Sequence, residues 1–137
     1  MNVAMTNYLE EKLLEHTLLN LPWTSPSTVY LGLFTADPGE AADTTNEVDA
    51  AEYTRQQINF SNVNVGTGED DSSFVLNTDD IEFPQAESEW GEITHVMIFD
   101  SETGGDGLFY GEVEIAKTIT EDDFIRFPAN ELEISLN

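Results

Sequence analysis

The sequence has 137 residues and no cysteine. This length suits one folded domain, and the missing thiols exclude a disulfide scaffold, a thiolate zinc site and a cysteine nucleophile. Its 28 acidic residues against 4 lysines and arginines give a net charge of −24, so it lacks the basic surface with which proteins bind nucleic acid or an anionic membrane.

The acidic excess also indicates the solvent for which the chain is built. Hydrophobic residues make up 39% and aromatic residues 10% of the chain, which is more than a disordered acidic chain contains. Self-repulsion of this size destabilises a compact domain in dilute salt, whereas molar salt shortens the Debye length to about 3 Å and screens the repulsion. The composition therefore favours adaptation to very high salt; an ordinary acidic protein and a nucleic-acid mimic are the alternatives.

The N-terminal region predicts one helix over residues 6–21. The first residues lack the basic start and apolar run of a signal peptide, and no apolar stretch reaches the ~20 residues of a membrane span. Thr6 or Asn7 can cap the helix, and Pro22 is expected to end it. Its leucines recur at helical spacing and form one stripe: Leu9, Leu13, Leu14, Leu18 and Leu21. That stripe packs either on its own domain or on a neighbouring subunit.

From residue 28 onward the pattern changes to that of strands. Eight short segments rich in β-branched and aromatic residues are separated by turn signals. They cover residues 28–34, 52–60, 73–76, 81–83, 92–99, 108–115, 124–127 and 131–136. This spacing predicts an all-β fold, an antiparallel β-sandwich or jelly-roll-like barrel. We expect one domain over residues 1–137, with the helix at 6–21 and the sandwich at 28–137.

The alternation within two strands predicts which side chains face the core. The segment 92–99 carries large side chains on both faces, which is typical of a central strand. One face is expected to hold Ile93, His95, Met97 and Phe99, and the other Val96 and Ile98. In the next strand, Val113 and Ile115 are expected to face inward while Glu112 and Glu114 face water. The 17 residues 35–51 form a long loop that can serve in contacts.

No pattern predicts a catalytic or cofactor-binding residue. The sequence has no nucleophile elbow and no phosphate-binding loop. Asp100, Glu102 and Asp106 alternate in a glycine-containing loop and are the metal candidates, for a loosely bound Ca²⁺ or Mg²⁺. However, Gly104 occupies the third ligand position of a calcium-binding loop. A plain glycine hairpin is therefore the favoured interpretation.

Five residues are candidates for subunit contacts. Leu9 and Leu13 belong to the helix stripe. Arg55 lies within a predicted strand and needs a carboxylate partner, inside one subunit or between two. Trp23 and Trp90 adjoin turn signals and are anchors either of the core or of an interface.

Several motifs resemble one family. They are Val29-Tyr-Leu-Gly-Leu-Phe-Thr-Ala-Asp-Pro38, Glu52-Tyr-Thr-Arg-Gln-Gln57, Trp90-Gly-Glu-Ile-Thr-His95, Thr103-Gly-Gly105, Leu108-Phe-Tyr-Gly111 and Leu132-Glu-Ile-Ser-Leu136. In their order and spacing over residues 8–137 they resemble the small structural proteins of tailed viruses that are usually labelled phage tail fibre proteins. The acidic loops depart from the family pattern and resemble a virion component of a haloarchaeal tailed virus.

The resemblance implies a non-enzymatic structural protein of the virion. As partners it implies further copies of the chain, in a homo-oligomer, and other virion proteins: the major capsid protein, or tail and baseplate proteins. Capsid decoration or turret and tail-fibre or baseplate attachment both remain open. A carbohydrate-binding or glycan-cleaving domain is the alternative from another class, and a nucleic-acid mimic that inhibits a host protein is the third.

Overall fold

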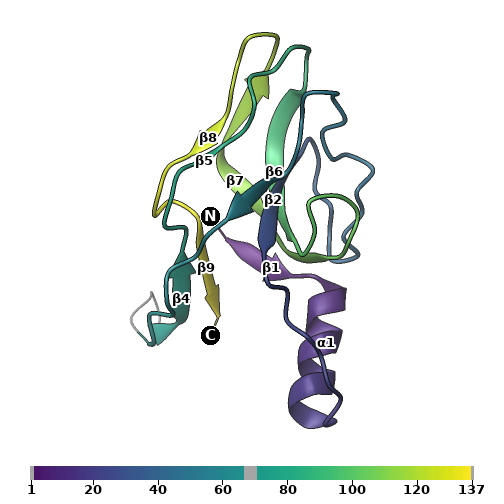
Figure 1. Cartoon of the computed structure of the whole chain (residues 1–137), viewed down its shortest axis with the longest axis vertical. Helices are drawn as coiled ribbons and strands as arrows, with labels where there is room; N and C mark the ends of the chain where they lie inside the picture. The colour runs from purple at the N-terminus through teal and green to yellow at the C-terminus, as the bar shows by residue number, and fades with distance from the viewer. Residues whose placement is uncertain (1, 67–70, 137) are drawn as a thin grey trace.

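A computed structural model describes residues 2–66 and 71–136 of the chain (Figure 1). In these residues it has one helix and nine strands. They are β1 (Val3–Met5), α1 (Asn7–Leu18), β2 (Val29–Phe34), β3 (Gln56–Ile58), β4 (Ser73–Leu76), β5 (Ile81–Glu82), β6 (Gly91–Phe99), β7 (Gly107–Ile119), β8 (Arg126–Phe127) and β9 (Glu133–Leu136). No helix among the described residues is long and apolar enough to cross a membrane.

The strands form one main sheet and two small ribbons. The main sheet is antiparallel, in the order β1-β7-β6-β2-β3, and the ribbons pair β4 with β9 and β5 with β8. Figure 1 shows both ribbons on the same side of the main sheet. The predicted all-β fold with one N-terminal helix is confirmed. The layer opposite the main sheet consists of the two ribbons, each made of two short strands.

The main core lies between the sheet and the ribbons. In the central pair of strands, Leu31 pairs with Ile98 and Leu33 with Val96, which places these four side chains on one face. They pack with Phe83 and the other buried residues of this cluster, among them Ile81, Ile125, Leu132 and Ile134. On the other face Phe34, Met97 and Phe99 form a second buried cluster with Ala42 of the long loop. Strand β6 is therefore covered on both faces, as its sequence predicts.

The expected face of Ile93 is wrong. Ile93 packs with Val96 and Ile98 in the main core, not with Met97 and Phe99. The register between β6 and β7 shifts between Ile93 and His95, so the simple alternation along β6 is broken at this point. A shift of this kind depends on the partner strand and leaves no mark in the local pattern.

The expected burial of Ile115 is also wrong. Ile93 faces Lys117 and His95 faces Glu112, so two steps along β6 correspond to five along β7. The extra residues of β7 form a bulge, which re-aims side chains. Val113 stays buried, whereas Ile115 is 85% exposed.

The helix begins where predicted and ends earlier. Thr6 is its N-cap and accepts a hydrogen bond from the Leu9 amide. Residue Asn20 adopts a left-handed φ of 54°, and the amides of Leu19 and Leu21 both donate to the Glu15 carbonyl. Asparagine tolerates this conformation and ends helices in this way, so the helix stops before Pro22 is reached.

The remaining strand boundaries differ mainly at the ends. The prediction for 73–76 matches β4, and the prediction for 28–34 matches β2 within one residue. The segments 52–60, 124–127 and 131–136 contain shorter strands than expected. Strand β1 is absent from the prediction because three residues show no periodicity. It pairs with the start of β7.

Candidate functional site

An exposed apolar surface lies at the far end of α1. Figure 1 shows the helix extending away from the sheet, with the chain returning beside it toward β2. Four large side chains at this end are exposed by 45% to 73%: Leu14, Leu18, Leu19 and Leu21. We call these four residues the leucine surface. Exposed apolar groups that cluster in this way are typical of protein–protein contacts.

The near end of the helix is held firmly on the sheet. The Thr6 hydroxyl donates to the Gly107 carbonyl at 2.7 Å, and the Thr6 amide donates to the Leu108 carbonyl at 2.9 Å. Thr6 is fully buried, and Leu9 of the first turn is 4% exposed. Because these contacts fix the first turn, the leucine surface is presented in a defined direction.

The two ends of the leucine stripe differ in burial. Leu9 packs inside the chain and is not available to a partner, whereas Leu13 is half-buried. Trp23 lies in the segment after the helix and is also half-buried. Leu13 and Trp23 thus keep surface that a partner can reach, and their interface role stays a prediction.

Arg55 has its partner inside the same chain. Its guanidinium donates to both oxygens of Glu47 at 2.8 Å and stacks on the Phe99 ring at 3.3 Å. Its Nη1 also donates to the carbonyls of Ser101 and Gly104, at 3.0 and 2.7 Å. Arg55 is 8% exposed. It thus ties the long loop that contains Glu47 to the loop between β6 and β7.

The three metal candidates lie in the loop that Arg55 holds. Asp100 uses one carboxylate oxygen to accept the Asp106 amide at 2.8 Å, and Glu102 accepts the Thr54 hydroxyl at 3.2 Å. Across residues 2–66 and 71–136, no three acidic or histidine side chains lie close enough together to hold a metal ion. The loop thus has the hydrogen bonding of a glycine-containing hairpin.

Trp90 is a core residue with a specific acidic partner. It is 5% exposed and packs edge-on against Tyr53, with the two ring centroids 5.6 Å apart. Its Nε1 donates to the Glu52 carboxylate at 2.8 Å, and the Glu87 amide and Ser88 hydroxyl donate to the same oxygen. These hydrogen bonds lower the pKa of Glu52 to about 2, and the one from Trp90 has the largest effect. Among 28 acidic residues the sequence holds no signal that singles out Glu47 or Glu52.

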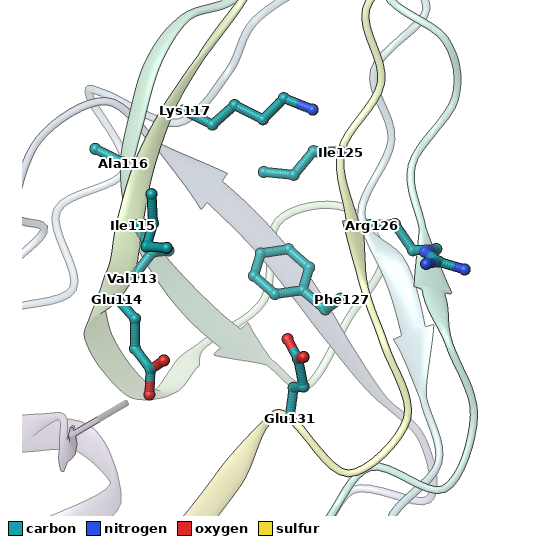
Figure 2. Close-up of a pocket in the computed structure, with 9 residues that line it drawn as sticks. All are labelled: Val113, Glu114, Ile115, Ala116, Lys117, Ile125, Arg126, Phe127 and Glu131. Atoms are coloured by element: carbon teal, nitrogen blue, oxygen red, sulfur yellow. The ribbon is translucent and has the colours of Figure 1, made fainter.

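A second surface feature is a groove beside the β7 bulge. It has a volume of about 320 Å³ and lies between β7 and the segment around β8. Figure 2 shows Phe127 in the middle of the groove, Lys117 toward one end, and Glu114 and Glu131 toward the other. The local sequence pattern does not indicate this groove, because two separate segments of the chain form it together.

The fold defines the class as an all-β protein with one projecting N-terminal helix. A family model described as Podophage GP4 fiber I protein gp80 matches residues 4–135. Because this is nearly the whole chain, the protein belongs to that family of phage fibre proteins. No curated protein matches the chain.

Family membership confirms two predictions made from the motifs. The resemblance to phage tail fibre proteins is correct, and the chain is a structural protein of the virion. The family is one of structural fibre proteins, which fits a chain in which no pattern predicts a catalytic residue.

Proposed function

We propose that the protein is a non-enzymatic, oligomeric subunit of the viral fibre, attached to another virion protein through its leucine surface. The observation that carries this proposal is the exposure of Leu14, Leu18, Leu19 and Leu21 at the far end of α1. These four account for nearly half of the nine large hydrophobic side chains exposed in the described residues. A helix with such a surface binds by laying it into an apolar groove.

The charges on α1 bear on the kind of partner. Glu10 and Glu11 lie toward the start of the helix, and Glu15 follows Leu14 of the leucine surface with Lys12 at 3.8 Å. An apolar groove with cations at its rim fits this arrangement, because opposite charges at a rim guide association. The expected partner is therefore a tail or baseplate protein with a basic edge. Family membership supports this location over a capsid turret.

The placement of the acidic residues supports adaptation to high salt. Apart from Glu47, which is 14% exposed in its ion pair with Arg55, the aspartates and glutamates in the described part of the chain are exposed or half-buried. The charge is therefore carried by the surface, where salt screens it.

A nucleic-acid mimic that inhibits a host protein makes a different prediction. Such a protein would be absent from purified particles, whereas a fibre subunit remains in them.

Quantitative mass spectrometry of purified virions tests the proposal. The double variant Leu14→Ser, Leu18→Ser should lower the copies per particle about tenfold or more, because apolar anchors dominate interface energies. The matched control is Val65→Ser, which removes an apolar side chain that is 76% exposed elsewhere. Its copy number should equal that of the unmodified chain.

Three outcomes contradict the proposal. If the unmodified chain is absent from particles, it is not a subunit of the viral fibre. Normal incorporation of the double leucine variant overturns attachment through α1. Several hundred copies per particle indicate capsid decoration in place of a fibre.

A further inference from the structure

The bulge in β7 presents an apolar side chain next to an apolar hollow. At 85%, Ile115 is the most exposed large hydrophobic side chain in the described residues. The groove beside it is lined by Val113, Ile125 and Phe127, which Figure 2 shows around a common space. Strand β1 covers the edge of β7 only as far as Gly111, so this region lies outside the β1–β7 pairing.

The same region carries charges of both signs, with Lys117 and Arg126 alongside Glu114 and Glu131. Of the four cations, Arg55 is buried against Glu47 and Lys12 lies on α1. The other two, Lys117 and Arg126, are among the residues that line the groove, and Arg126 also pairs with Asp80 at 3.2 Å. Figure 2 places Lys117 toward one end and Glu131 toward the other. The surface therefore has a positive end and a negative end.

We propose that this surface is a two-fold contact with a second copy of the chain. Its members, here named the bulge patch, are Val113, Ile115, Lys117, Ile125, Phe127 and Glu131. Ile115 of each copy enters the groove of the other, and Lys117 of each copy faces Glu131 of the other. A two-fold axis brings the same patch together on both sides. The inference rests on the proposed oligomeric state and names the surface that produces it.

Charge is the reason for choosing a second copy as the occupant. Two chains of net charge −24 repel each other over most of their surface. The repulsion is weaker at the groove, because Lys117 and Arg126 balance Glu114 and Glu131 in its lining. A patch with a protruding side chain, a hollow and charges of both signs is complementary to itself.

Side chains, not backbone pairing, make this contact. The bulge interrupts the regular spacing along β7, and bulges oppose the continuous addition of a further strand. Lys117 donates to the Phe124 carbonyl at 2.7 Å, which fixes its position at the end of the groove. Phe124 is itself 60% exposed and extends the apolar surface.

The first experiment measures association by sedimentation equilibrium of the full chain in molar KCl, where the general repulsion is screened. Ile115→Glu should raise the dimer dissociation constant about tenfold or more, as expected for a central apolar anchor. The control Val65→Glu adds the same charge at another exposed apolar position and should leave the constant unchanged. Circular dichroism confirms that each variant is folded.

The second experiment tests the two-fold arrangement by exchanging charges at lower salt. Lys117→Glu and Glu131→Lys should each weaken self-association, because like charges then face each other. An equimolar mixture of the two variants should associate again, because positions 117 and 131 carry opposite charges in the mixed dimer. A mixture that stays monomeric overturns the two-fold contact.

The outcomes separate this inference from the proposed function. An oligomer that Ile115→Glu leaves intact overturns the bulge patch and leaves oligomerisation through another surface. A wild-type chain that stays monomeric at about 0.5 mM overturns the patch and the oligomeric state together. The attachment of α1 to the virion is measured independently by the copy number in particles.

Discussion

Arg55 and Arg126 show that the contribution of an arginine to stability depends on its surroundings. The Arg55–Glu47 pair is 7% and 14% exposed, whereas the Arg126–Asp80 pair is 50% and 45% exposed. Arg55→Ala should lower the free energy of unfolding by about 3–5 kcal/mol, because it leaves a largely buried carboxylate without its partner. Arg126→Ala should cost at most about 1 kcal/mol. Urea denaturation at constant salt measures both, and equal losses would contradict the assignment.

Glu52 should confer a distinct pH dependence. Its pKa lies near 2 in the folded chain, below the usual 4.5. The stabilisation is therefore present above about pH 4.5 and is lost as the pH falls toward 2. The difference in unfolding free energy between the unmodified chain and Glu52→Gln should shrink over this range. Urea unfolding followed by Trp90 fluorescence, with Trp23→Phe in both chains, measures it. A difference that stays constant with pH would count against this role.

At the scale of the elements, Gly111 allows β1 to reach the sheet. A Cβ atom on Gly111 would overlap the main-chain oxygen of Asn2 and lie 3.0 Å from Val3 Cγ1. Gly111→Ala should therefore displace β1 and cost about 1–3 kcal/mol. Hydrogen exchange should accelerate in β1 and α1 before β2 and β6. Ala116→Val, at an exposed position of the same strand, is the control, and unchanged exchange in β1 would refute the prediction.

For the whole molecule, the surface charge should make stability depend on salt. Lowering KCl from molar to dilute concentrations restores repulsion among surface carboxylates. The melting temperature should fall by at least about 5 °C, which for this length corresponds to more than ~1 kcal/mol. A variant with Glu87→Gln, Glu89→Gln and Glu121→Gln should show a weaker dependence. An unchanged melting temperature would contradict adaptation to salt and leave the virion role intact.

Much of the fold could be predicted because it depends on local patterns. Alternation and turn residues gave the positions of β2, β4 and β6, and the capping preference of Thr6 gave the start of α1. The motifs were sufficient to indicate the phage fibre family that the family model identifies. The candidate surface was predicted only in part, since the leucine stripe was visible but its exposed end was not.

The sequence by itself therefore determined the strand-rich class, the helix start, the surface charge and the family. Short-range periodicity, side-chain chemistry and motif spacing are sufficient for these features. Only the tertiary structure decided the face of Ile93, the exposure of Ile115 and the partner of Arg55. Each of these depends on the register between β6 and β7 or on contacts between segments that are distant in the chain, such as the contact of Arg55 with Gly104. Local sequence carries no information about such pairings.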